Sequence, residues 1–161
     1  MQECTIRPAT IADYDRICEL AAQMDRLHRT ALPDRFREPA GPNRARGYVE
    51  SLIADPDTLL AVAESEGRVV ALLNSGLEQT PDIPVKPPSR FLRVRGLVVD
   101  EAYRRQGIGQ ALLAAAVEWA ADRGAQEVQL SVYEFNSVAA AFCRSHGFSP
   151  LSSRFVRPLG R

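Results

Sequence analysis

The sequence lacks an excess of either charge. Its 161 residues include 20 basic and 20 acidic side chains, which leaves a formal net charge of zero. Such a chain has no general attraction to nucleic acid or to an anionic membrane, so any preference for a charged substrate must come from a local group of side chains. We therefore expect neither nucleic acid nor membranes among its partners.

Cysteines and long apolar runs are also scarce. The three cysteines, Cys4, Cys18 and Cys143, form an odd set without metal-ligand spacing, which is typical of a reducing compartment and predicts no metal site. No apolar run approaches the roughly 20 residues of a membrane-spanning helix. Residues 1–8 show no signal-peptide pattern. The expected location is the cytoplasm.

What the sequence does contain is the composition of one globular domain. Hydrophobic residues make up 45% and charged residues 25%, and we expect a single domain over residues 1–161. Apolar periodicity predicts an α/β fold, with one mixed, mostly antiparallel sheet and helices on both faces. We expect strands at 4–7, 59–64, 68–77, 91–99 and 127–133, helices at 11–28, 48–53, 108–120 and 137–146, an exposed loop at 80–89, and a last extended segment at 148–158.

The most informative segment is 96–113, where an apolar strand is followed by a basic turn, two glycines and an amphipathic helix. Gly107 and Gly109 would let the main chain approach an anion without a Cβ atom in the way, and the free N–H groups of the following helix would point at it. Arg104 and Arg105 add charged donors. The segment predicts a phosphate site, and the alternative is a tight turn with solvated arginines.

Two other kinds of phosphate loop do not fit this segment. A nucleoside-triphosphate loop needs Gly-Lys-Ser/Thr at its end, which is absent, and a dinucleotide fingerprint needs a third glycine where Leu112 stands. Residues 100–103 also separate the strand from the glycines. These differences argue against a nucleotide-binding domain.

Residues 104–109 match the Arg/Gln-x-x-Gly-x-Gly/Ala signature of the GCN5-related N-acetyltransferase (GNAT) superfamily. A second region of that superfamily, Asn-x-x-Ala-x-x-aromatic with a closing Gly-Phe, is matched by Asn136, Ala139, Phe142 and Gly147-Phe148. The sequence resembles this superfamily over nearly its whole length. The resemblance implies acetyl-CoA as cosubstrate and a sheet that splays where the cofactor binds.

The resemblance also implies the residues that hold the cofactor. The motif strand would present backbone groups to pantetheine, the turn would cradle the pyrophosphate, and the second region would reach the pantetheine or the last helix and line the thioester channel. In that order, the residues are Leu97, Val98 and Val99, then Arg104, Arg105, Gln106, Gly107, Ile108, Gly109 and Gln110, and finally Asn136 and Phe142. Phe142 is equally compatible with a place in the core.

Acyl transfer to an amine needs a neutral amine, donors for the oxyanion and a proton for the leaving thiolate. The backbone at Val98 or Val99 could serve the oxyanion. Many relatives supply the proton from a tyrosine whose position is held here by Cys143, which could donate a proton or be a small buried residue. Relatives often carry a carboxylate base on the motif strand, and here Arg93 and Arg95 stand at those positions.

The two arginines suggest a charged acceptor. Alternation predicts that Arg93, Arg95 and Leu97 share one face of the strand. Our hypothesis is that the amine acceptor carries a carboxylate or phosphate bound by Arg95, while Glu78, Glu134 or a water chain deprotonates the amine. The alternative is a pair of solvated arginines at the sheet edge.

His28 stands at the start of a loop that walls the acceptor site in many relatives. We consider it a candidate acceptor contact or base, and a capping or surface histidine is the alternative.

Two functions stay open at this level. The expected one is an acetyl-CoA-dependent N-acetyltransferase that acts on a primary amine of a small molecule or protein by direct transfer in a ternary complex, because positioning alone can support catalysis. The other is a non-catalytic acyl-CoA-binding sensor or regulatory module, which the absence of both familiar catalytic side chains would suit. A homodimer is a further expectation, since the segment 148–158 could pair with the edge of a partner.

Overall fold

The computed structural model describes residues 4–160 of the chain. The chain forms two compact units, with the boundary between Ser131 and Val132. The expectation of one domain over residues 1–161 stays a prediction. No helix of the described residues has both the length and the apolar content that crossing a membrane requires.

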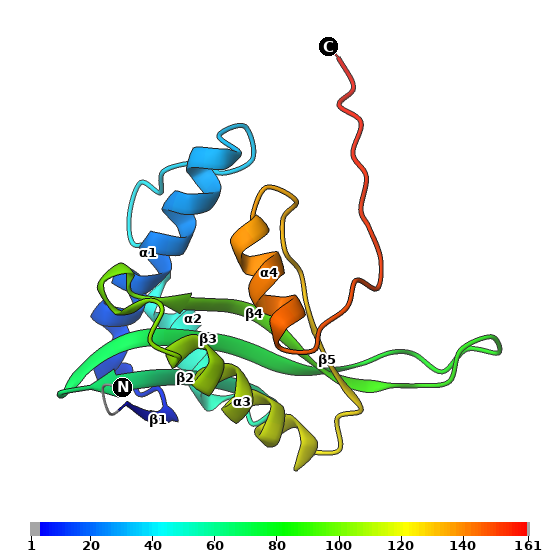
Figure 1. Ribbon diagram of the computed structural model, residues 1–161, viewed down its shortest axis with the longest axis horizontal. Helices are drawn as coiled ribbons and strands as arrows, with labels where there is room; N and C mark the ends of the chain where they lie inside the picture. The colour runs from blue at the N-terminus through cyan, green and yellow to red at the C-terminus, as the bar shows by residue number, and fades with distance from the viewer. Residues whose placement is uncertain (1–3, 161) are drawn as a thin grey trace. The chain divides into compact units, whose positions relative to one another are not determined.

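The first unit is built on a five-stranded sheet (Figure 1). Its strands follow one another across the sheet in chain order, and neighbours are antiparallel except for the last two, which are parallel. They are β1 (Thr5–Pro8), β2 (Thr58–Ser65), β3 (Arg68–Gln79), β4 (Arg90–Val99) and β5 (Glu127–Leu130). The predicted mixed, mostly antiparallel sheet is confirmed.

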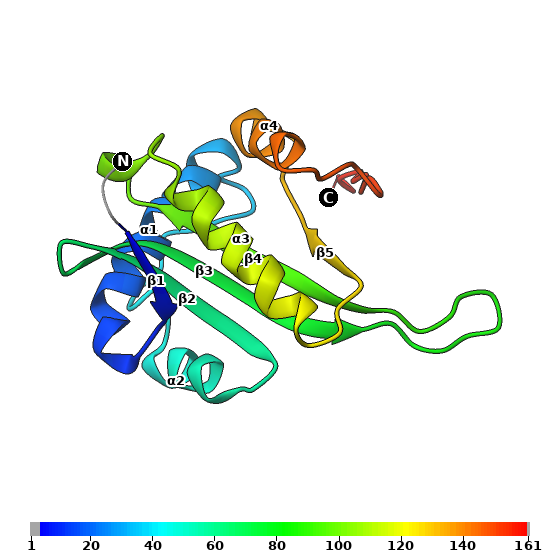
Figure 2. The ribbon, with the colours of Figure 1, turned by 60° about the horizontal axis from the view of Figure 1, so that its bottom comes forward.

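Helices cover both faces of this sheet (Figures 1 and 2). A short 3-10 turn, Ile11–Asp13, leads into α1 (Tyr14–Ala31), and α1 shares one face with α2 (Arg46–Ala54). The other face is covered by α3 (Ile108–Ala121). Leu20 of α1 and Leu112 of α3 are completely buried, and burial of a leucine side chain contributes about 1.5–3 kcal/mol. Each helix is therefore fixed to the sheet by its apolar stripe.

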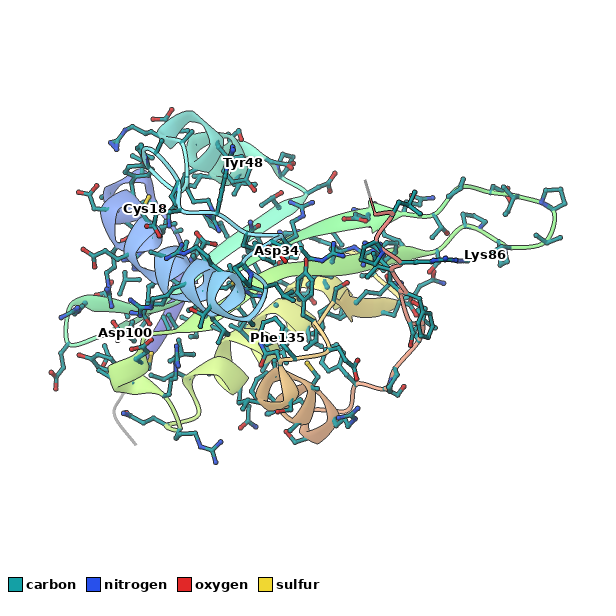
Figure 3. All side chains as sticks on the ribbon, turned by 90° about the horizontal axis from the view of Figure 1, so that it is seen from above. Cys18, Asp34, Tyr48, Lys86, Asp100 and Phe135 are labelled. Atoms are coloured by element: carbon teal, nitrogen blue, oxygen red, sulfur yellow. The ribbon has the colours of Figure 1, made fainter. Side chains whose placement is uncertain are left out.

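Strands β3 and β4 continue beyond the sheet as a long hairpin that carries Lys86 near its tip (Figures 1 and 3). The loop 80–89 closes this hairpin with a single bridge between Ile83 and Lys86. Val85 is 90% exposed. The four prolines of the loop remove backbone donors, so the ladder cannot continue. The predicted exposed loop is confirmed.

The second unit contains α4 (Ser137–Ser145) and the segment that follows it. Gly147 ends the helix with a left-handed φ of 85°. Residues 148–160 form no strand, so the predicted pairing of 148–158 with the preceding strand is wrong. Pro150 and Pro158 lack the N–H group that a ladder needs, and Phe155 and Val156 interrupt the alternation.

Candidate active site

The turn between β4 and α3 is shaped by two residues in the left-handed region. Arg105 has a φ of 65° and Gly107 a φ of 81°, and successive N–H groups in such a turn converge to form a nest that suits anions. Gly107 is also the residue before the first turn of α3. Glycine takes this φ without strain, so the turn depends on it at this position.

The backbone N–H groups of this turn are not used within the described part of the chain. Among residues 4–160, no backbone or side-chain acceptor takes the N–H groups from Arg105 to Gln110. They surround the positive end of the α3 dipole, where an anion is stabilised. Nε of Arg104 donates to the carbonyl of Val99 at 3.0 Å, and Arg105 is exposed. The predicted turn residues thus form one donor-rich surface.

The edge of β4 beside this turn is open. Pairing between β4 and β5 ends at Val94 and Leu130, so within the first unit the segment 95–99 has no strand on that side. Leu97, Val98 and Val99 lie in this unpaired stretch, next to the turn. The sheet therefore opens where backbone groups were expected to meet an extended ligand.

A β-bulge at Arg95 changes which side chains share a face. The register with β3 shifts there, and Arg95 has no partner of its own on β3. Arg95 lines a cavity together with Val98, and alternation then puts Leu97 on the opposite face. The expectation that Arg93, Arg95 and Leu97 share one face is wrong for Leu97, because the extra residue of the bulge reverses the alternation beyond it.

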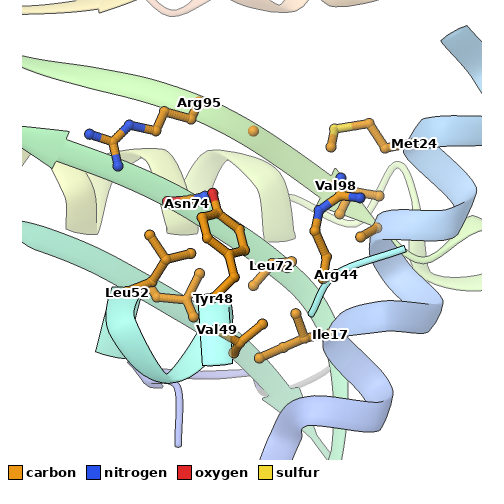
Figure 4. Close-up of a pocket in the computed structure, with 13 residues that line it drawn as sticks. Ile17, Met24, Arg44, Tyr48, Val49, Leu52, Leu72, Asn74, Arg95 and Val98 are labelled. Atoms are coloured by element: carbon orange, nitrogen blue, oxygen red, sulfur yellow. The ribbon is translucent and has the colours of Figure 1, made fainter. Parts of the chain in front are cut away.

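The cavity on this face, of about 170 Å³, lies between α1, α2 and strands β2 to β4 (Figure 4). Its walls are mostly apolar, and Met24 of α1 packs against Gly96, the residue after the bulge. A few polar side chains also line it, namely Arg44, Tyr48, Asn74 and Arg95. An apolar pocket with a few convergent polar groups is the usual form of a small-molecule site.

The polar groups of the cavity differ in how far they are already paired. Both terminal nitrogens of Arg44 donate to Asp25 at 2.9 Å, and this ion pair raises the pKa of Arg44. Oδ1 of Asn74 is buried and accepts no hydrogen bond from the described residues. The guanidinium of Arg95 lies 3.9 Å from Glu78, and the Arg95 side chain is 38% exposed. Asn74 and Arg95 are thus the polar groups best able to meet a ligand.

The match to a known family covers most of the helices and strands described above. The model of the acetyltransferase (GNAT) family matches residues 21–148, more than half of the chain. The chain belongs to the acetyltransferase (GNAT) family. GNAT proteins use acyl-CoA.

Several proteins that this GNAT chain resembles are N-acetyltransferases. It is 31% identical over 155 residues to an N-alpha-acetyltransferase of Sulfurisphaera tokodaii, covering 91% of the chain and 81% of that relative. It is 31% identical over 109 residues to N-acetyltransferase 8 of Homo sapiens, covering 66% of the chain. The chain spans less than half of the length of the first curated relatives, and 45% of N-acetyltransferase 8.

A solved structure has the same fold throughout. A mutant of the BH1408 protein from Bacillus halodurans superposes with a TM-score of 0.92 at 27% identity, covering 96% of this chain and 99% of that chain. The predicted GNAT fold is confirmed.

The candidate base Glu78 lies between the two arginines of β4. Its carboxylate is 3.3 Å from Nε of Arg93 and 3.9 Å from Arg95. The structure thus brings together Glu78, Arg93 and Arg95, which were all candidate site residues from the sequence. Arg93 and Glu78 do not line the cavity. Glu78 offsets part of the positive charge that Arg95 presents.

His28 lies elsewhere on α1. Its Nδ1 is 2.8 Å from the carbonyl of Met24, and its ring packs 5.3 Å from Phe36. It is absent from the cavity lining. The candidate role of His28 in acceptor binding stays a prediction.

The other predicted residues of this GNAT chain belong to the second unit. Oδ1 of Asn136 accepts the N–H of Ala139 at 3.0 Å and caps α4, which is one of its two expected roles. Phe142 packs 4.3 Å from His146. Burial raises the pKa of the Cys143 thiol. Glu134 is exposed.

Arg44, Tyr48 and Asn74 were not predicted from the sequence. Asn74 had a signal, because it is the first polar side chain after the apolar run 69–73. Arg44 and Tyr48 had none, since they flank the start of α2 without any motif. Within the described residues, no group of histidine, cysteine or carboxylate side chains is arranged to hold a metal ion.

Proposed function

We propose that this protein is an N-acetyltransferase that transfers the acetyl group of acetyl-CoA to a primary amine by direct transfer in a ternary complex. The observation that carries the proposal is the run of unpartnered N–H groups from Arg105 to Gln110 beside the open edge of β4. The family uses acyl-CoA, and the acetyl group itself is part of the proposal.

The first unit would bind the cofactor mainly through its backbone. When bound, acetyl-CoA supplies an activated thioester. The N–H groups of the turn would bind the pyrophosphate, and the segment 97–99 would hold pantetheine and donate to the oxyanion at Val98 or Val99. We assign Asn136 and Phe142 of the second unit to pantetheine and to the thioester channel.

Cys143 is our candidate for the residue that protonates the leaving thiolate. Because burial raises its pKa, the thiol stays protonated at neutral pH and could give its proton to the leaving thiolate. The same shift disfavours a thiolate nucleophile. Glu78 and Glu134 are our candidates to deprotonate the amine.

We place the amine acceptor in the cavity beside the bulge. Oδ1 of Asn74 would accept an N–H of the amine, and Arg95 would bind a carboxylate or phosphate of the same acceptor. An amine held by one N–H keeps its lone pair free for attack, and an amide oxygen cannot itself take the proton.

The test is a calorimetric titration with acetyl-CoA of the parent and of Gly107→Glu. Gly124→Glu is a matched control, because Gly124 has a similar φ, 76°, and an equally open surrounding at the other end of α3. We expect micromolar binding in the parent and in the control, and its loss in Gly107→Glu, since the carboxylate would repel the phosphates. A folded parent that binds no acetyl-CoA would overturn the proposal.

A panel of amines, including peptides with free α-amino groups, then separates an enzyme from a binding module. Release of free CoA thiol with any amine supports the transferase, whereas tight binding without thiol release over the panel supports a non-catalytic sensor.

We retain two further proposals. The cytoplasm is supported by three free cysteines. A homodimer is supported by the exposed apolar side chains of Leu151, Phe155 and Leu159, and light scattering on the purified chain will give its mass directly.

A further inference from the structure

One side of α1 contacts residues 100–101, which form the junction between β4 and the turn 104–110. Arg16 donates to the carboxylate of Asp100, and Oε1 of Gln23 accepts the N–H of Glu101 at 3.1 Å. Arg26 pairs with the Glu101 carboxylate at 3.1 Å. Spacings of seven and three residues put the three α1 side chains on one side of the helix. Figure 3 shows Asp100 beside α1.

Arg16 and Asp100 form the buried part of this junction. Asp100 is 7% exposed. Burial raises its pKa, but the hydrogen bonds from Arg16 and from the N–H of Ala102 outweigh it and lower the pKa below its usual range. Nε of Arg16 also donates to the carbonyl of Val69 at 2.7 Å. One guanidinium thus ties α1 both to β3 and to the end of β4.

The junction continues directly into the turn. Asp100 accepts the N–H of Ala102 through its side chain, at 3.0 Å, and the N–H of Tyr103 through its backbone, at 2.8 Å. Arg104 then returns to the carbonyl of Val99. Beyond Arg104, no described residue accepts the N–H groups from Arg105 to Gln110. The N–H groups from Ile108 onward belong to α3, which fixes their directions. Those of Arg105, Gln106 and Gly107 precede the helix, so their directions in the free protein depend on how firmly the preceding residues are held.

We propose that Arg16 and Gln23 are positioning residues for the cofactor. By holding Asp100 and Glu101, they preorganise the N–H groups from Arg105 to Gly107 for a pyrophosphate. The inference rests on the proposed function, and it concerns residues that touch neither substrate. Without these contacts, binding of the phosphates would have to order the turn first.

The experiment compares calorimetric affinities for CoA and for pantetheine, which lacks the pyrophosphate, in Arg16→Met, Gln23→Leu and the parent. Pantetheine is measured by competition. Arg29→Met is the matched control, because Arg29 lies on the same helix and pairs with Glu38 instead. We expect CoA affinity to fall about tenfold in Arg16→Met, roughly the cost of ordering one residue, and less in Gln23→Leu. Pantetheine affinity should not change, and Arg16→Lys should recover part of the loss.

A purely structural role would lower the melting temperature and leave the CoA affinity of the folded protein unchanged, which would overturn the inference. Equal losses for CoA and pantetheine would do the same. If Arg16→Met does not fold, the test rests on Gln23→Leu, which changes no charge. Failure of the parent to bind CoA is a different result and counts against the proposed function instead.

Discussion

At the scale of single residues, Asn74 and Arg95 distinguish the cavity from an ordinary piece of core. One is a buried oxygen that accepts no hydrogen bond from the described residues, and the other is a cation that stands at a bulge and lines the cavity. Buried polar atoms are nearly always paired, so an unpaired one at a cavity wall indicates that a ligand or water completes it. Two predictions follow from this pair of side chains.

The first concerns the charge of the acceptor. Arg95→Glu should raise the KM for an acceptor found in the amine panel by roughly 10- to 100-fold, because a hydrogen bond to a charged group is worth about 1.5–3 kcal/mol. The KM for acetyl-CoA should stay near the parental value. Arg123→Glu, which reverses a charge at the far end of α3, serves as control. An unchanged acceptor KM in Arg95→Glu would rule out the anionic acceptor.

The second concerns the buried oxygen. Asn74→Leu replaces an unsatisfied amide by an apolar group of similar shape, so we expect the free energy of unfolding to rise by about 1 kcal/mol while acceptor binding weakens. Urea denaturation measures the first effect. Asn43→Leu is the matched control and should destabilise, because the Asn43 amide already donates to the carbonyl of Cys18 at 2.9 Å. A less stable Asn74→Leu would mean that the oxygen has a partner in the folded protein.

At the scale of elements, the helices and loops that depend on a short stretch of sequence were predictable. The helical stripe of α3 and the prolines of the loop 80–89 each act within a few residues, and the helix and the exposed loop predicted from them are confirmed. The phosphate site predicted from Gly107 and Gly109 stays a prediction. The bulge at Arg95 was not predictable, because it is a property of the register between two strands rather than of either sequence.

The prediction of an extended, pairing segment at 148–158 was wrong for a related reason. An extended apolar segment becomes a strand only where an edge accepts it, and the segment 148–158 has prolines at positions that would have to donate. The cavity was equally hidden, because its polar residues come from the start of α2, from β3 and from β4. Only the folded sheet brings them together.

At the scale of the whole molecule, buried ion pairs set the response to acid. The hydrogen bond from Arg7 lowers the pKa of Asp13 below its usual 3.8, and the contact with Arg16 lowers that of Asp100. A carboxylate whose folded pKa lies below its unfolded pKa stabilises the fold above the unfolded value, and this contribution is lost as the pH falls through the folded pKa.

The free energy of unfolding should therefore decline below about pH 4 as these two groups take up protons. Urea titrations at a series of pH values will measure the decline. In Asp13→Asn it should be shallower than in the parent, because one titrating group is gone. Parallel curves for the two proteins would contradict the assignment.

Helix α1 has two working sides. Ile17, Ala21 and Met24 line the cavity in which we propose the acceptor to bind, while the neighbouring side holds the junction that leads to the turn 104–110. An acceptor in the cavity would contact α1 directly, and a phosphate on the turn would act on α1 through the junction. The two ligands would then share the entropy of ordering this helix, so the ligand that binds second finds that cost already met. Thermodynamic linkage then requires each ligand to change the affinity of the other by the same factor, whichever of them binds first.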